Sequence, residues 1–384
     1  MKPKIMLVFG TRPEAIKMAP LCHAFYKQSE IFDTFVCVTA QHREMLDQVL
    51  NLFEITPDFD LDLMSPGQDL FDITSNVLLG MRDILEEVKP DLVLVHGDTS
   101  TTFATSLAAF YAGVRVGHVE AGLRTYDLFS PFPEEFNRQV TGKLADWHFC
   151  PTTLSAQNLI DEGVPSEKAR VTGNTVIDAL YWVINRFDSD DSLKSKTIKH
   201  LTKRLSFNWE VDQFILITGH RRENFGAGFI SICEAIRDLA ELFPGIQFVY
   251  PVHLNPNVQQ PVMSIVGNLR NVHLIAPLSY EPFIYLLNKC HLVLTDSGGI
   301  QEEAPSLGKP VIVMRDTTER PEAVSSGNVI LVGASKEKII ANVTTLLTDQ
   351  DSYQKMANAL NPYGDGNSSE YIVNIIKESF NNER

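Results

Sequence analysis

The chain has 384 residues, of which 44% are hydrophobic and 21% charged, a composition typical of a folded globular protein with about two domains. Its formal net charge is −15, which argues against broad binding of nucleic acid or of anionic membranes, since both favour a basic protein surface. The five cysteines lack CxxC spacing, which argues against a disulfide framework or a cysteine zinc site.

The segment near the N-terminus predicts a strand and not a secretory signal. Residues 2–11 enter an apolar run that is too short for a signal peptide and has no cleavage site. No segment reaches the roughly 18 uninterrupted apolar residues that span a bilayer. We therefore expect a cytoplasmic protein.

The first half alternates short apolar runs with amphipathic stretches, which predicts βαβ units and a buried parallel sheet. We predict strands at 4–10, 34–40, 91–98, 115–122 and 147–151, and helices at 13–28, 70–88 and 101–113.

The same alternation starts again in the second half, after a predicted helix at 176–187 and a polar stretch at 188–200. We predict strands at 214–220, 247–253, 272–278, 291–297, 309–315 and 329–333, and helices at 228–243, 282–290, 300–308, 336–347 and 370–380. The fold class is therefore α/β, with two doubly wound Rossmann-like domains facing a cleft. We place the first domain at residues 1–172, completed by a C-terminal helix at 367–384, and the second at residues 173–366.

The residues directly after each strand carry most information, because ligands of open parallel sheets bind at the carboxyl ends of the strands. After the first strand, Pro13 fits the first turn of a helix. Arg12 and Lys17 then lie near a helix N-terminus, which favours anions. By themselves they are better explained as a solvated turn carrying two ordinary surface cations.

Carboxylates follow the next strands of the same half. Asp98 ends one strand, Glu120 ends another, and Glu134 begins a helix together with Glu135. Each has an ordinary structural explanation, as a helix cap or as a partner of a helix dipole. Their convergence on one sheet edge favours acid–base chemistry, because neighbouring carboxylates separate each other's pKa values.

The second half places cations and glycines at its strand ends. His220, followed by two arginines, suggests an anion site. Ser297-Gly298-Gly299 lets the backbone approach a diphosphate at a helix N-terminus, with a simple tight turn as the alternative. Glu303 is placed to accept ribose hydroxyls, and Arg320 would complete a basic wall.

Several common motifs are missing from the sequence. It has no GxGxxG after the first strand and no GxxxxGK[ST], which argues against a nicotinamide dehydrogenase and a P-loop nucleotidase. HExxH, zinc-spaced Cys/His clusters and GxSxG are also missing. We expect no metal and no cofactor.

The chain resembles the bacterial non-hydrolysing UDP-N-acetylglucosamine 2-epimerases over nearly its whole length. The sequence segments on which the resemblance rests are FGTRPEAIKMAPL, TAQHREMLDQVL, LVHGDTSTT, VGHVEAGLRT, SPFPEEFNR, TGNTVIDAL, TGHRREN, YPVHLNPNV, LTDSGGIQEEAPSLGKPV and MRDTTERPEA. Their length and order leave chance agreement negligible.

The resemblance implies a glycosyltransferase-B-type fold with the nucleotide mainly on the second domain. The catalytic set that it implies is Asp98, Glu120, Glu134 and His220. The substrate-binding residues that it implies are Arg12, Lys17, Asp98, Glu120, His220, Leu278, Phe283, Ser297, Gly298, Gly299, Glu303 and Arg320. Without the resemblance, Phe283 would be predicted to be a core residue. The resemblance implies that it lies next to uracil. Leu278 stands where family members often carry a polar residue.

The implied reaction is elimination of UDP from UDP-N-acetylglucosamine, followed by re-addition to give UDP-N-acetylmannosamine through 2-acetamidoglucal. The product would supply activated N-acetylmannosamine for surface polysaccharides. The resemblance also implies a homodimer and a second UDP-N-acetylglucosamine as an allosteric activator, with Gln41, Arg221 and His253 lining its site.

Three alternatives use the same nucleotide-sugar site. A glycosyltransferase would pass the sugar to an acceptor, and a hydrolysing 2-epimerase would release free N-acetylmannosamine. A non-catalytic nucleotide-sugar sensor would not need the carboxylates and His220, all of which are present.

Overall fold

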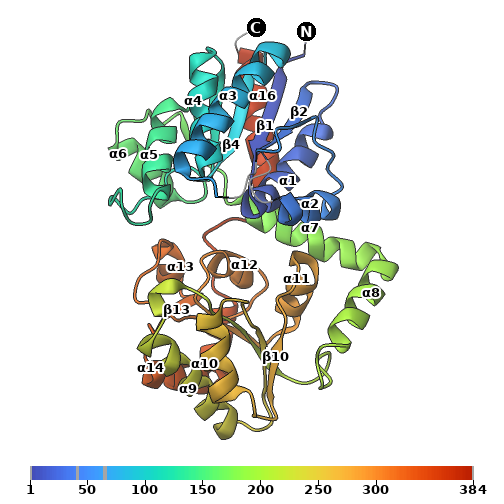
Figure 1. The fold of residues 1–384 in the computed structure, drawn as a ribbon, viewed down its shortest axis with the longest axis vertical. Coiled ribbons are helices and arrows are strands. Elements are labelled where there is room, and N and C mark those ends of the chain that lie inside the picture. Colours follow the sequence, from blue (N-terminus) through green and yellow to red (C-terminus); the bar gives the residue numbers. More distant parts are fainter. Residues whose placement is uncertain (1, 40–42, 64–66, 383–384) are drawn as a thin grey trace. The chain divides into compact units, whose positions relative to one another are not determined.

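The computed structural model describes residues 2–39, 43–63 and 67–382. The chain divides into two compact units, which we call unit 1 (residues 1–179 and 363–384) and unit 2 (residues 180–362) (Figure 1). The chain passes from unit 1 to unit 2 inside helix α7 (Thr175–Ser189). It returns to unit 1 after residue 362. The domain boundaries expected from the sequence were after residues 172 and 366.

Unit 1 is built around a parallel sheet that, in the described residues, has the strand order β3-β2-β1-β4-β5-β6-β7. The strands are β1 (Lys4–Phe9), β2 (Asp33–Val38), β3 (Phe59–Asp60), β4 (Leu92–His96), β5 (Arg115–Val119), β6 (Trp147–Cys150) and β7 (Ala169–Val171). The helices are α1 (Arg12–Tyr26), α2 (Arg43–Leu52), α3 (Leu70–Val88), α4 (Ser100–Tyr111), α5 (Glu134–Leu144), α6 (Thr153–Asp161), the start of α7, and α16 (Ser368–Asn382).

Unit 2 repeats this architecture with the strand order β10-β9-β8-β11-β12-β13. The strands are β8 (Phe214–Thr218), β9 (Gln247–Pro251), β10 (Val272–Ile275), β11 (Leu292–Thr295), β12 (Val311–Val313) and β13 (Val329–Leu331). The helices are α8 (Asp191–Thr202), α9 (Ala227–Leu242), α10 (Pro256–Val266), α11 (Tyr280–Lys289), α12 (Ile300–Ser306), α13 (Pro321–Ser326), α14 (Lys336–Thr348) and α15 (Gln350–Ala357), with a 3₁₀ turn η1 (Arg222–Asn224).

The predicted α/β class with two parallel-sheet domains is confirmed. The sequence did not single out the short strands β3 and β7, which carry little apolar signal. The polar stretch 188–200, assigned to no element, contains most of helix α8. Its N-terminus is capped by Asp190, whose side chain accepts a hydrogen bond from the backbone N–H of Leu193 at 2.9 Å.

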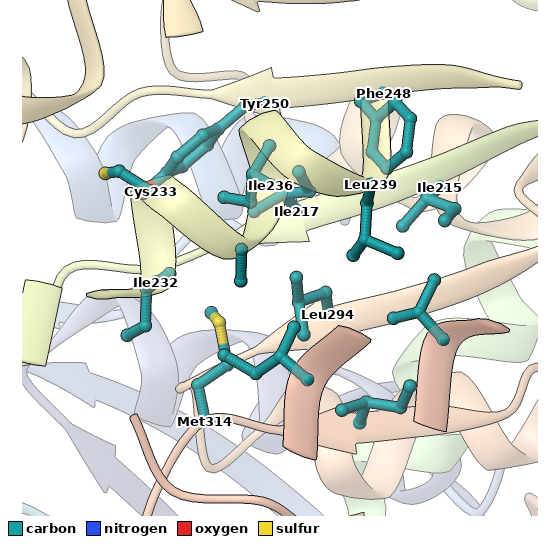
Figure 2. Packing of buried hydrophobic residues seen from close by; sticks show 14 of the residues in the cluster. Ile215, Ile217, Ile232, Cys233, Ile236, Leu239, Phe248, Tyr250, Leu294 and Met314 are labelled. Carbon is teal, nitrogen blue, oxygen red and sulfur yellow. The ribbon is translucent and has the colours of Figure 1, made fainter. Parts of the chain in front are cut away.

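The central strands of the two sheets are buried on both faces, which explains why they are continuous apolar runs without alternation. In unit 2, Ile215 and Ile217 of β8 and Leu294 of β11 are fully buried. They pack with Ile236 and Leu239 of α9 in one hydrophobic cluster (Figure 2). Burying one such side chain stabilises the fold by roughly 1.5–3 kcal/mol, so this cluster fixes the register of the strands whose ends carry the site.

Each sheet reverses its strand order at one place, between β1 and β4 in unit 1 and between β8 and β11 in unit 2. The loops at such a switch point diverge to opposite sides of the sheet and leave a crevice for ligands. Over the described part of the chain, no helix has the length and apolar character needed to cross a membrane.

Candidate functional site

The loops after β1 and β4 are fastened together by the buried carboxylate of Glu14. Its Oε2 accepts the backbone N–H groups of Gly10 and Thr11 at 3.0 and 2.7 Å. Its Oε1 accepts the hydroxyls of Thr99 and Thr102 at 2.6 and 3.2 Å. Burial raises the pKa of Glu14, although these hydrogen bonds oppose the shift. Helix α1 therefore starts at a fixed point, with the predicted ligand-binding residue Arg12 as its first residue.

Lys17 and Glu120, which are 103 positions apart in the sequence, form an ion pair. The Oε2 atom of Glu120 also accepts a hydrogen bond from the Nδ2 of Asn174 at 2.8 Å, and the Nε2 of His96 lies 3.8 Å from it. Glu120 has a backbone φ of +61°, a conformation that a side chain other than glycine rarely adopts. The structure thus brings two predicted site residues together, and it adds Asn174, which the sequence did not single out.

Asp98 is held by the helix that carries Glu134. Arg138 of α5 is buried and contacts the Oδ2 of Asp98 at 2.5 Å and the Oε2 of Glu135 at 2.7 Å. The Nδ2 of Asn137 donates to the backbone carbonyl of Asp98 at 2.9 Å. Helix α5 therefore fixes both the backbone and the side chain of Asp98. The sequence had not singled out Arg138, whose role depends on a partner 40 positions away.

Glu134 and Glu135 have different environments, although they are neighbours in the first turn of α5. Burial raises the pKa of Glu135, but hydrogen bonds from Gln139, the Thr125 backbone and Arg138 lower it further, so its net shift is downward. The Oε2 atom of Glu134 is buried without a hydrogen-bond partner. Glu135 is thus a structural anion, whereas Glu134 has an oxygen that no protein group contacts by a hydrogen bond.

A row of buried histidines crosses the sheet behind these carboxylates. His96, His118 and His148 lie on the adjacent strands β4, β5 and β6. Burial lowers their pKa values to about 4, 3 and 4 respectively, so all three are neutral at pH 7. The Nε2 of His118 contacts the carbonyl oxygen of Gly97 at 2.7 Å and fixes the left-handed turn that precedes Asp98.

In unit 2, His220 and Arg221 follow β8 at the switch point. The His220 imidazole has a side-chain exposure of 44%. It stacks on the ring of His253, with centroids 5.2 Å apart and planes 11° from parallel. Burial lowers the pKa of His220, while the charge of Asp296 opposes this shift. The structure therefore brings together the predicted catalytic histidine and the two predicted regulatory residues that it describes.

The glycine turn after β11 lies against Arg320. A Cβ atom at Gly298 would stand 2.7 Å from the Nη1 of Arg320, so a larger residue at this position would displace the guanidinium. Arg320 contacts the carboxylate of Glu302 on helix α12 at 2.5 Å. Arg320 therefore lies against Gly298, in the turn that also contains Ser297 and Gly299.

The remaining predicted residues lie on neighbouring loops and helices of unit 2. Glu303 is buried, and its Oε1 accepts the hydroxyl of Tyr280 at 2.8 Å. Leu278 and Phe283 are both partly buried, in the loop after β10 and in α11. Gln41 lies outside the described residues. In the described ranges there is no group of three or more His, Cys, Asp or Glu side chains that could hold a metal ion.

Comparison with known proteins gives a match over most of the chain. Residues 25–377 match the family described as UDP-N-acetylglucosamine 2-epimerase. A Yersinia pestis protein named UDP-N-acetylglucosamine 2-epimerase is 59% identical over 374 residues, which are 97% of this chain and 98% of that protein. A protein of the same name from Escherichia coli strain K12 is 59% identical over 376 residues, covering 98% of this chain and 99% of its own length.

Solved structures agree with these sequence matches. The Neisseria meningitidis UDP-GlcNAc 2-epimerase bound to UDP-GlcNAc is 53% identical, with a TM-score of 0.89, and the match covers 98% of this chain and 100% of that one. The Methanocaldococcus jannaschii UDP-GlcNAc 2-epimerase in complex with UDP-GlcNAc and UDP is 32% identical, with a TM-score of 0.80, over 98% and 99% of the two chains.

We predict that Arg138→Met lowers the free energy of unfolding by about 3–5 kcal/mol, because it leaves the carboxylates of Asp98 and Glu135 without their buried cation. Urea denaturation measures this loss. The matched control is Arg82→Met, whose partner Asp83 is exposed and whose removal should change stability by less than about 1 kcal/mol. Equal losses for the two variants would contradict the assigned role of Arg138.

Proposed function

The chain belongs to the UDP-N-acetylglucosamine 2-epimerase family, and from this premise we propose that it is an isomerase that interconverts UDP-N-acetylglucosamine and UDP-N-acetylmannosamine. The observation that carries the proposal is the pair of carboxylates at adjacent strand ends, Asp98 after β4 and Glu120 after β5, each beside a cation. Such a pair suits a reaction that moves a proton while charge develops on a sugar ring.

The reaction starts with elimination. The bond between carbon-1 and the diphosphate oxygen breaks, a carboxylate takes the proton from carbon-2, and a carbon–carbon double bond forms. The products held by the enzyme are 2-acetamidoglucal and UDP. Because the carbon-2 proton is poorly acidic, departure of UDP must lead, and the transition state resembles an oxocarbenium ion. Addition then reverses these steps, with the proton delivered to the opposite face of carbon-2.

Unit 1 would stabilise the cationic ring and move the protons. Glu120 is held in position by the side chains of Lys17 and Asn174. Asp98 is held by the side chains of Arg138 and Asn137. Glu134 has a buried oxygen without a hydrogen-bond partner. These features support assigning proton transfer to the three carboxylates, a role worth about 10²–10⁴-fold in rate for each acid–base group.

Unit 2 would hold the nucleotide and stabilise the departing diphosphate. Gly298 leaves room for the Arg320 guanidinium next to the backbone, and His220 stands at the neighbouring strand end. Arg12 and Lys17 would add cations from unit 1. We assign the uracil and ribose contacts to Leu278, Phe283, Ser297, Gly299 and Glu303, and the activated product to the synthesis of surface polysaccharides.

We further propose that the enzyme is a cytoplasmic homodimer. All five cysteines are buried and free, as suits a reducing compartment. On unit 1, the large apolar side chains of Leu79 and Tyr111 are exposed by 52% and 70%. They line a pocket of about 690 Å³ between α3 and α4. An apolar face of this kind supports contact with a second copy.

The assay that tests the function uses UDP-N-acetylglucosamine alone, in deuterated water with excess EDTA. We predict a mixture of the two epimers, with deuterium at carbon-2 of the product and, with time, of recovered substrate. No turnover without an acceptor would indicate a transferase. Release of stoichiometric UDP with free N-acetylmannosamine would indicate a hydrolysing enzyme. Glu120→Gln and Glu134→Gln should each lose about 10²–10⁴-fold in turnover and release glucal and UDP more readily than epimer. Product without deuterium would contradict the elimination mechanism.

We predict that Arg320→Ala weakens UDP binding more than Glu134→Gln does. The first variant removes a charge-assisted partner of the diphosphate, worth about 1.5–3 kcal/mol, whereas the second changes only the sugar end of the site. Isothermal calorimetry with UDP measures both, after circular dichroism has shown that each variant is folded. Equal losses of affinity would contradict the assignment of Arg320.

We also propose that a second UDP-N-acetylglucosamine activates the enzyme at a site lined by Gln41, Arg221 and His253. A ligand that binds one conformation better than another shifts the population toward it. Saturation with UDP-N-acetylmannosamine should therefore be sigmoidal, and a trace of UDP-N-acetylglucosamine should make it hyperbolic. Hyperbolic kinetics in both directions, unchanged by His253→Ala, would remove this site.

A further inference from the structure

Asp296, the residue directly after β11, is a buried carboxylate beside the exposed imidazole of His220. Its side chain is completely inaccessible to solvent. Its Oδ2 atom accepts the backbone N–H groups of His220 and Arg221, each at 2.8 Å, with the Nδ2 of Asn224 at 3.5 Å. One oxygen of Asp296 thus fixes the backbone that carries the predicted catalytic histidine.

The other oxygen of Asp296 faces the histidine ring. Oδ1 is buried without a hydrogen-bond partner and lies 3.7 Å from the Nδ1 of His220. A buried carboxylate oxygen without a donor is costly, and a small rotation of the exposed ring would supply one. Catalytic hydrogen bonds in unliganded enzymes are often long and shorten when substrate binds.

Neighbouring side chains leave the backbone around His220 little freedom to move. The hydroxyl of Tyr250 donates to the carbonyl of Gly219 at 2.8 Å. The Nδ2 of Asn224 donates to the carbonyl of Met314 at 3.0 Å. His253 covers one face of the His220 ring. The backbone is therefore held on both sides of His220. The imidazole of His220 is the group that remains able to rotate.

We propose that Asp296 is a positioning residue for His220. Its Oδ1 accepts the Nδ1–H of the imidazole, which directs Nε2 toward the substrate and stabilises the imidazolium while negative charge develops on the departing UDP. This inference rests on the proposed function, in which His220 acts at the leaving diphosphate. It extends that function by one residue, which touches no substrate and acts through the histidine.

Three charged or titratable groups face His220, and they act in opposite directions. Besides the dominant effect of burial, His253 and Arg221 lower the pKa of His220, while Asp296 raises it. Without the carboxylate, the pKa of His220 falls further. A reaction that needs protonated His220 would then lose activity at a lower pH, so the alkaline limb of the kcat profile moves to lower pH.

The test compares Asp296→Asn with Tyr250→Phe, which removes the hydrogen bond to Gly219 in the same turn without changing a charge. We expect Asp296→Asn to lower kcat by about 10²–10⁴-fold, with a much smaller change in KM, and to shift the alkaline limb to lower pH. Tyr250→Phe should leave that limb in place. Equal shifts of the limb in the two variants would show that Asp296 acts only as part of the scaffold, and would overturn the proposal.

A double-mutant cycle provides a second criterion. In a His220→Gln background, Asp296→Asn should cost little more, because the residue through which the carboxylate acts is already gone. The same loss in both backgrounds would overturn the proposal.

A third measurement needs neither substrate nor a substitution at Asp296. ¹⁵N NMR of histidine-labelled wild-type protein, with the His220 signal assigned through His220→Gln, should show the neutral ring protonated on Nδ1. Protonation on Nε2 would refute the positioning role even if epimerisation is observed. Absence of any epimer would refute the proposed function, and the NMR result would still decide the relation between Asp296 and His220.

Discussion

The carboxylate of Glu14 accepts hydrogen bonds from the loop after β1 and from the first turn after β4. It thereby fastens the two strand ends between which the order of the unit 1 sheet reverses. Asp296 does the corresponding work in unit 2, because it follows β11 and accepts the backbone N–H groups of the loop after β8. A switch point separates two loops and exposes their polar backbone groups. A buried carboxylate that satisfies these groups closes the gap without filling the crevice that a ligand needs.

The predicted site residues Asp98 and Glu120 lie on loops next to this fastening. Glu120 has a left-handed backbone, and so does Gly97, which precedes Asp98. The position of a Cβ at Gly97 lies 3.6 Å from the Oε1 of Glu120, so the two loops are in close contact. Strained residues persist where the surrounding structure determines them. For Glu120 these surroundings are Lys17, Asn174 and the neutral His96.

Much of this arrangement could be predicted from the sequence, and the remainder could not, for a physical reason. Apolar runs identify parallel strands, and residues such as Asp98, Glu120 and His220 follow the strand ends within two residues. The partners that hold them are set by register and helix packing. Asn174 reaches Glu120 across 54 positions, Arg138 reaches Asp98 across 40, and Asp296 reaches His220 across 76. No local pattern marks such a partner. From the sequence alone, Asp296 is an ordinary residue at the end of a strand. Its proximity to His220 follows only from the pairing of Thr218 with Thr295 on adjacent strands.

The two units show how one topology supports different chemistry. Both have a parallel sheet with a single reversal, yet the sequence shows no internal repeat. In unit 1 the strand ends carry carboxylates, each beside a cation. In unit 2 they carry an imidazole, a glycine turn and a guanidinium, groups that favour an anion. The same topology therefore presents carboxylates at the strand ends of one unit and anion-binding groups at those of the other, because the residues that follow the strands can vary while the buried strands that position them keep one pattern.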